Sequence, residues 1–457
     1  MHEVSLGVLC YKHRKWLTFF SFIFSIFVFT TLIVSAKPVQ DDYATLSLVS
    51  ENGFIGFLNS NWQSHGGNIW PMALHALVVA SALDSFSFIS ISIFIISTIF
   101  LITTSIIYFF SKLLKQPSAN EKLFLYILIV GTLLGFEGLF SPGLIGSYLF
   151  SSASLVHLWP VCFFVLGISK SISTKRYWVG LFLLGIVTGN TNISESVSFI
   201  FTILLIKKMN IINNINDIKT ATKYNINIFF SGVLFGTLLI LIAPGFWVRA
   251  NSVQGTSFES ISTYFLEFMK SFLIFAVDMI SHPVFYIFLI LGSIYGRKIL
   301  NSMHAVYYFP ILEILFICLF LSLVVGSVFA YPAWHQSLGL LFLLPFCAFS
   351  LGTKFAIQVS NLLGTSRLFL LVLFIGILSF SIIRATSLVI DRSSDWKISN
   401  DLNICKIKIN NEIDIQNPEL LYPPFSLGVE DIQSWPWIKD AYIGWIKNNN
   451  TVDNKQC

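Results

Sequence analysis

Residues 86–111 read FSFISISIFIISTIFLITTSIIYFFS and carry no charged side chain over 26 positions. At a rise of 1.5 Å per residue, such a helix is about 39 Å long, and about 30 Å is enough to cross the hydrocarbon of a bilayer. Apolar stretches of this kind recur along the 457-residue chain, which is 55% hydrophobic and only 11% charged. A soluble domain carries about 25% charged residues, so the sequence predicts an integral membrane protein.

The apolar stretches predict an all-α protein with about eleven transmembrane helices. Two of the blocks are short and flank the polar run GNTNISE at 189–195, so they either cross the membrane or form a hairpin that does not fully cross. The predicted blocks are residues 17–36, 86–111, 124–140, 152–169, 177–191, 195–206, 226–243, 268–295, 305–330, 338–352 and 368–386.

Positive charge is unequally divided between the two sides of these blocks. The loops on one side hold 17 Lys and Arg residues, whereas the short loops on the other side hold two, Lys37 and Arg249. Because short cytoplasmic loops retain positive charge, the pattern predicts a cytoplasmic N-terminus. The net charge of +5 then reflects topology and does not call for a nucleic-acid partner.

This topology divides the chain into a transmembrane domain, residues 1–386, and an external C-terminal segment, residues 387–457. The external segment is rich in Trp and Tyr, which favour the membrane interface, so we expect it to pack on the outer face. Residues 37–85 form a long first external loop, part of which is apolar enough to lie along the interface as a helix.

Two adjacent carboxylates, Asp41 and Asp42, open the first external loop. Like charges at a membrane boundary repel unless a cation, a proton or a basic group of a substrate compensates them. A carboxylate with a raised pKa could act as a general base toward a hydroxyl. The alternative is a solvated loop in which an Asp caps a helix.

Further ionisable and aromatic residues gather toward the predicted outer face. Glu195 lies near the external edge of its block, and Arg249 is the isolated cation of a short external loop, where an anionic lipid headgroup is the alternative partner to a substrate phosphate. Outer histidines include His65, His75, His157 and His335. The chain has no HExxH motif and no Walker A motif, so a dedicated zinc site and ATP-driven transport are disfavoured.

The order of these features resembles the GT-C superfamily of polytopic glycosyltransferases, and within it the bacterial glucosyltransferase-like membrane proteins that modify O-antigen or other surface polysaccharide. Five short elements carry the resemblance, and they are spread over nearly the whole chain. They are Asp41-Asp42-Tyr43, the Trp62 to His65 stretch, Gly189 to Asn192 with Glu195, Ala243-Pro244-Gly245 with Arg249, and Trp435 to Tyr442.

The resemblance implies transfer of a sugar from a polyprenyl-phosphate donor to a glycan or lipid-linked acceptor at the outer face of a bacterial cytoplasmic membrane. Asp41 or Asp42 would deprotonate the acceptor, with a divalent cation as an option there, and Arg249 would stabilise the departing phosphate in a single inverting displacement. The remaining expected substrate contacts are Tyr43, Trp62, His65, Asn190, Asn192, Glu195, Trp334 and His335.

Two other functions fit parts of the pattern. An O-antigen-type polysaccharide polymerase would be expected to have a large central external loop with several Arg residues, whereas 244–267 has one. A flippase for lipid-linked sugars, or another transporter, would place its polar site near the middle of the membrane, where Asp278, His282 and Glu313 are the candidates.

Overall fold

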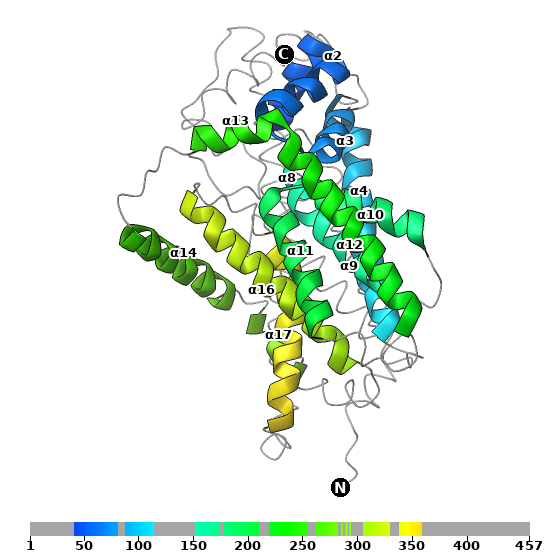
Figure 1. The fold of residues 1–457 in the computed structure, drawn as a ribbon, viewed down its shortest axis with the longest axis vertical. Helices are drawn as coiled ribbons and strands as arrows, with labels where there is room; N and C mark the ends of the chain where they lie inside the picture. The colour runs from blue at the N-terminus through cyan, green and yellow to red at the C-terminus, as the bar shows by residue number, and fades with distance from the viewer. Residues whose placement is uncertain are drawn as a thin grey trace, which may run out of the picture.

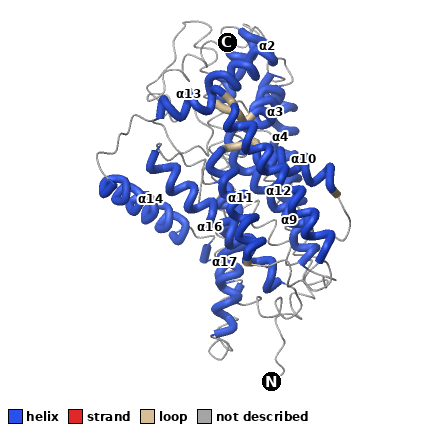
Figure 2. Tube along the Cα trace, viewed as in Figure 1, coloured by secondary structure: helices blue, strands red, loops and turns tan. Residues whose placement is uncertain are grey.

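The computed structural model describes residues 41–80, 87–113, 151–172, 177–209, 219–253, 261–281, 285–286, 288–290, 292–293, 305–329 and 338–358. The described residues form twelve α-helices and two π-helical turns, η1 and η3 (Figures 1 and 2). The prediction of an all-helical membrane protein is confirmed for this part of the chain. The predicted spans at 17–36, 124–140 and 368–386, and the C-terminal segment, lie outside the described residues.

The segment predicted as the first external loop, residues 37–85, is largely helical where the structure describes it. It contains α2 (Asp41–Ser60), the π-helical turn η1 (Asn61–His65) and α3 (Ile69–Ala80). α2 is kinked at Gly53, whose φ of 70° falls in the left-handed region that glycine adopts at little cost. α13 (Pro244–Val253), from the segment 244–267 that is also predicted to be external, packs on η1, so α2, α3 and α13 lie at one end of the molecule (Figure 1).

Four stretches of helix are long and apolar enough to cross a membrane: Ser90–Phe109, Ser154–Ser171, Thr222–Ile242 and Phe309–Gly326. They belong to α4 (Ser87–Leu113), to η3 (Ser154–Leu158) with α9 (Trp159–Ser171), to α12 (Lys219–Ile242) and to α16 (Ala305–Phe329). α8 (Ser151–Ala153) leads directly into η3. The chain is therefore a multi-pass membrane protein.

The other described helices are α10 (Trp178–Gly189), α11 (Ile193–Lys208), α14 (Ile261–Ser281) and α17 (Leu338–Gln358). α14 begins seven residues before the predicted block at 268–295. Glu267 and Lys270, one turn apart and 3.5 Å from each other, allow this polar stretch to join the helix. α12 likewise begins seven residues before its predicted block.

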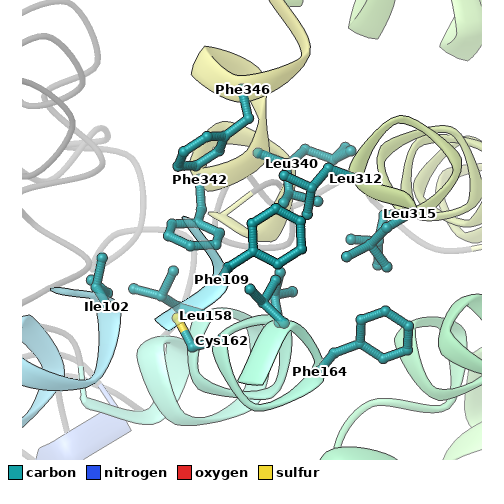
Figure 3. Packing of buried hydrophobic residues seen from close by; sticks show 14 of the residues in the cluster. Ile102, Phe109, Leu158, Cys162, Phe164, Leu312, Leu315, Leu340, Phe342 and Phe346 are labelled. Atoms are coloured by element: carbon teal, nitrogen blue, oxygen red, sulfur yellow. The ribbon is translucent and has the colours of Figure 1, made fainter. Parts of the chain in front are cut away.

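The hydrophobic core lies where α4, α9, α16 and α17 meet. Figure 3 shows Phe109 of α4, Phe164 of α9, Leu315 of α16 and Phe342 of α17 converging on this region. Hydrocarbon tails are as apolar as these side chains, so burial from water does not hold such helices together within a bilayer. Close packing and hydrogen bonds between helices supply the cohesion instead.

α10 and α12 are in close contact through two glycine pairs spaced four residues apart. A Cβ atom added to Gly189 would lie 2.1 Å from the carbonyl oxygen of Val233, and one added to Gly236 would lie 2.4 Å from that of Ile186. Gly185 and Gly232 make equally close approaches one turn away. Small residues at this spacing let helix backbones touch in membranes. The contact fixes the end of α10, from which the polar run at 189–195 emerges.

Basic side chains lie together at the ends of helices remote from α2, α3 and α13. The Nζ atom of Lys170 lies 4.9 Å from the ring centre of Tyr108 and 4.8 Å from that of Tyr177, so it joins the end of α4, the end of α9 and the start of α10. These are cation–π contacts. The described part of the chain thus has a basic end, opposite α2, α3 and α13. Among its acids, Glu313 of α16 is paired with Lys354 of α17, 2.6 Å away.

Candidate functional site

The polar turn between α10 and α11 ends in a well-formed helix cap. Asn192 has an extended backbone, and its Oδ1 accepts a hydrogen bond from the backbone N–H of Ser194 at 3.1 Å. This is the geometry of an N-cap, for which Asn is among the best residues. Glu195 is then the third residue of α11, where the helix dipole favours a negative charge.

Glu195 is paired with a histidine from η3. Its Oε1 atom lies 2.6 Å from Nδ1 of His157, and the two side chains are 8% and 6% exposed. The hydroxyl of Thr191 lies 3.4 Å from the other carboxylate oxygen. Burial of two ionisable groups inside helices of a membrane protein is costly unless they are paired, and this contact pairs them.

The η3 turn owes part of its geometry to Pro160, which follows it at the start of α9. Proline has no N–H to donate to the carbonyl oxygen of Val156, four residues earlier. The Thr191 hydroxyl lies 3.1 Å from that oxygen and donates to it instead. Thr191 therefore ties η3 to the α10–α11 turn and holds His157 against Glu195. Single π-helical turns of this kind are frequent at functional sites.

A small cavity adjoins the pair. Its polar lining residues are His157, Ser194, Glu195 and Ser322, and its other lining residues come from α16 and α17: Leu319, Leu323, Gly326, Gly339 and Leu340. The space open to the centre of a water molecule is about 20 Å³. This is room for one water or one hydroxyl group and not for a sugar ring.

Arg249 of α13 brings a positive charge to this end of the molecule. α13 lies directly on η1, because a Cβ atom at Gly245 would be 2.7 Å from the backbone nitrogen of His65 and 2.8 Å from the carbonyl oxygen of Trp62. The charge of Arg249 acts on both His65 and His157. The pKa of His65 is lowered, first because the surrounding protein partly desolvates its ring and second because Arg249 repels the imidazolium.

Asp42 is buried between α2 and α3. Its Oδ1 atom lies 3.7 Å from Nδ1 of His75, and its side chain is 2% exposed. The other ring nitrogen of His75 lies 3.0 Å from the hydroxyl of Thr45. A histidine of the chain thus stands beside Asp42. Asp41 is the first residue of α2.

Asn190 links the α10–α11 turn to the start of α3 and the residues before it. Its amide nitrogen donates to the carbonyl oxygen of Gly67 at 2.7 Å, and its Oδ1 accepts from the backbone nitrogen of Ile69 at 2.9 Å. Trp70, at the start of α3, donates from Nε1 to the carbonyl oxygen of Val187 at 2.7 Å. These bonds hold the Asp42 region and the Glu195 region in one rigid arrangement.

The structure thus brings together His65, Asn190, Asn192, Glu195 and Arg249 among the predicted site residues. Trp62 is half-buried in η1 beside α13, and Asp42 lies one helix away. The side chains of Asp41 and Tyr43, and all of Trp334 and His335, lie outside the described residues. Within the described part, no three His, Cys, Asp or Glu residues are close enough together to hold a metal ion.

Sequence reasoning did not assign partners to His75 and His157, although it placed both toward the outer face. The available signal was a histidine within an apolar stretch together with an acid near the outer end of another, since each such group needs a partner in the membrane. Comparison of the chain with protein-family models, with curated proteins and with solved structures gives no match.

Proposed function

We propose that this protein is a membrane glycosyltransferase of the GT-C type. It moves a sugar from a polyprenyl-phosphate-linked donor to a glycan or lipid-linked acceptor at the extracytoplasmic face of a bacterial cytoplasmic membrane. About eleven transmembrane helices and the external C-terminal segment belong to this proposal. The multi-pass helical architecture supports it, together with the two buried acid–histidine pairs, Asp42–His75 and His157–Glu195.

The observation that carries the proposal is the position of Arg249. Arg249 lies in α13, at the end of the molecule opposite the basic end. Its positive charge interacts electrostatically with His65 and with His157, and His157 contacts Glu195. Sugar transfer from a phosphate carrier needs a cation that stabilises charge on the departing phosphate and a group that takes the acceptor proton. Arg is suited to the first role because its planar fork matches phosphate oxygens.

The base would come from the outer polar groups. Asp41 and Asp42 are the candidates that the resemblance implies, and Asp42 is engaged by His75 inside the α2–α3 pair. Asp41, at the first position of α2, is therefore the better candidate of the two.

The test is transfer by the purified protein in lipid nanodiscs, with a panel of radiolabelled polyprenyl-phosphate hexoses and membranes of the host as acceptor. We expect label in the acceptor fraction with one donor, and a loss of about 10²-fold or more for Arg249→Gln, with partial activity in Arg249→Lys. Absence of transfer with every hexose donor would refute the proposal as stated.

One observation favours transport as a second candidate. The His157–Glu195 pair is buried, and His157 lies within Ser154–Ser171, a helical stretch long enough to span the membrane. The proton-binding groups of transporters are likewise buried within membrane spans. A flippase would move the lipid-linked sugar between leaflets of a sealed vesicle and leave its sugar–phosphate bond intact. The same donors, assayed for leaflet exchange and for bond cleavage, separate the two functions.

A further inference from the structure

Arg249 and His65 lie on the two sides of the contact between α13 and η1. Gly245 of α13 touches the backbone of η1, because a Cβ atom added to it would be 2.7 Å from the backbone nitrogen of His65. Arg249 follows Gly245 by four residues, so both lie on the same face of α13. Side chains of a helix lean toward its N-terminus, which brings Arg249 back toward Gly245. Helix geometry therefore directs the guanidinium toward the turn that ends at His65.

The ring of His65 is open to a ligand. His65 is the exposed last residue of η1, and its ring makes no hydrogen bond or ion pair with another described residue. Repulsion by Arg249 adds to partial desolvation in lowering the pKa of His65, so the ring is neutral at pH 7. An anion bound between the two groups would offset this repulsion and favour the imidazolium. Arg249 has five N–H donors, so it can bind such an anion beside a partner within the protein.

The other elements that pack on η1 are α2 and α3. Their described charged groups have partners of their own, since Asp42 is paired with His75, and Glu51 accepts a hydrogen bond within α2. Among the described groups, the charge that acts on His65 is that of Arg249. With its ring protonated, this place carries two positive charges, which suits an anion with two negative charges.

The charge on the carrier phosphate changes in just this way during the proposed transfer. The donor is a phosphodiester with one negative charge. The departing carrier is a phosphate monoester, whose second pKa is about 6, so it carries nearly two negative charges at pH 7. One Arg matches the charge of the donor, and a second cation is needed only as the bond to the sugar breaks. A group that favours the product-like charge in this way favours the transition state over the donor.

We infer that Arg249 and His65 together form a site for a phosphate monoester, whereas the diester donor is held by Arg249 alone. This inference rests on the proposed sugar transfer. The phosphate oxygen keeps the electron pair of the broken bond to the sugar, and His65 takes up one proton from water as the second negative charge develops. The proton of the acceptor hydroxyl goes to the base named above, so the two proton movements are separate.

The first test is equilibrium binding to the full-length protein in phosphatidylcholine nanodiscs. The probes are farnesyl phosphate, a monoester, and its methyl ester, a diester with the same chain. We expect the monoester to bind about 10-fold more tightly at pH 6, and its affinity to fall by about 10-fold between pH 6 and 8, because His65 must gain a proton. His65→Gln should bind both probes alike, with no fall in affinity as the pH rises. Gln63→Ala, which removes another exposed side chain of η1, is the matched control and should behave as wild type.

Two further arms distinguish the sources of the phosphate. Methyl phosphate, which has no lipid chain, should show the same fall in affinity with pH at a lower overall affinity. Phosphatidylglycerol added to the nanodiscs is a diester and should not displace farnesyl phosphate. Displacement by phosphatidylglycerol would make this a site for ordinary lipid headgroups and overturn the inference.

The second test uses sugar transfer with the donor that the panel identifies. His65→Gln should lower kcat by about 10-fold with the donor KM unchanged, and weaken inhibition by the polyprenyl phosphate product by a similar factor. A merely structural role would not separate kcat from KM in this way. Gly245→Ala should lose the preference for the monoester although both side chains remain, because its Cβ forces α13 away from η1.

Equal affinity of the wild-type protein for the two farnesyl probes would overturn the inference and leave the sugar transfer standing. A preference for the monoester that persists in His65→Gln would also overturn it. His65 is exposed, so its replacement spares the buried core, and the result does not depend on whether Gly245→Ala folds. If the wild-type protein transfers no sugar, the proposed function fails, and the binding of the two probes decides the phosphate site separately.

Discussion

Nδ1 of His157 lies 2.6 Å from Oε1 of Glu195, although 38 residues separate the two along the chain. The contact joins a π-helical turn to the first turn of α11 and places both groups on a cavity shared with α16 and α17. A histidine and a carboxylate buried at this distance stabilise each other and would be costly singly. Their neighbours therefore give the sharpest tests of how this end of the protein is built.

Thr191→Val should weaken the link between η3 and the α10–α11 turn. The change removes the hydroxyl that donates to the Val156 carbonyl, which Pro160 cannot satisfy, and we expect a loss of about 1–3 kcal/mol in stability. Thermal unfolding in detergent measures it. Thr188→Val is the matched control, because that hydroxyl bonds only the Leu184 carbonyl of its own helix, so little change is expected. Equal losses in both variants would contradict the assigned role of Thr191.

Gly189→Ala should separate α10 from α12. Its Cβ would stand 2.1 Å from the Val233 carbonyl oxygen, so the helices must shift, at a cost of about 1–3 kcal/mol. Thermal stability measures the cost. Gly180→Ala in the same helix is the control, since no atom lies within 4 Å of its added Cβ, and it should be neutral or slightly stabilising. A stable Gly189→Ala protein would show that this helix contact is wrong.

Asn190→Ala should lower the stability of the protein, whether or not Asn190 contacts a substrate. It leaves the Gly67 carbonyl and the Ile69 N–H without their side-chain partner, at about 1–3 kcal/mol. Asn192→Ala should lose about 1 kcal/mol through its cap on α11. Unfolding midpoints of the two variants, read beside their donor KM, separate a structural role from substrate binding. A raised donor KM with an unchanged unfolding midpoint in Asn190→Ala would instead indicate that Asn190 binds the substrate.

Arg249→Gln should raise the pKa of His65 toward its ordinary value. The Arg249 charge disfavours the imidazolium, so its removal leaves partial desolvation as the cause of the lowered value. A lowered pKa makes the folded state less favourable as pH falls below about 6.5, and the variant should lose less stability over that range. Titration of His65 by NMR with labelled histidine tests the shift. Lys208→Gln, at the opposite helix ends, should leave the titration unchanged.

The predicted orientation is testable with paired reporters. A fluorescent protein fused after Asn214 should fold and fluoresce, because the basic loop containing it is predicted to be cytoplasmic. Alkaline phosphatase fused after Thr256 should be active, because that segment is predicted to lie outside. The reverse pattern would invert the membrane topology and place Arg249 and Glu195 toward the cytoplasm.

Among the described residues, hydropathy alone predicted the long apolar helices, because a bilayer admits few alternatives to a helix in an apolar stretch. The predicted block at 86–111 corresponds to α4, and 195–206 lies within α11. The helix ends were less predictable, since polar residues such as Glu267 extend α14 beyond the apolar stretch. The site was predictable in part: Glu195 and Arg249 stood out as charges in unfavourable surroundings. The partner of Glu195 did not, because pairing across 38 residues depends on how α10 and α11 fold back, and no local pattern reports it.

The glycine contact that ties α10 to α12 has a further consequence through the length of α10. Its 12 residues reach about 18 Å, which is about 12 Å short of the hydrocarbon thickness of a bilayer. With Tyr177 at the basic end, the turn bearing Asn190 and Glu195 would lie below the outer surface of the lipid. A thinned or indented leaflet around this turn would let the headgroup of the proposed lipid-linked donor reach it sideways, without the donor first being lifted out of the membrane.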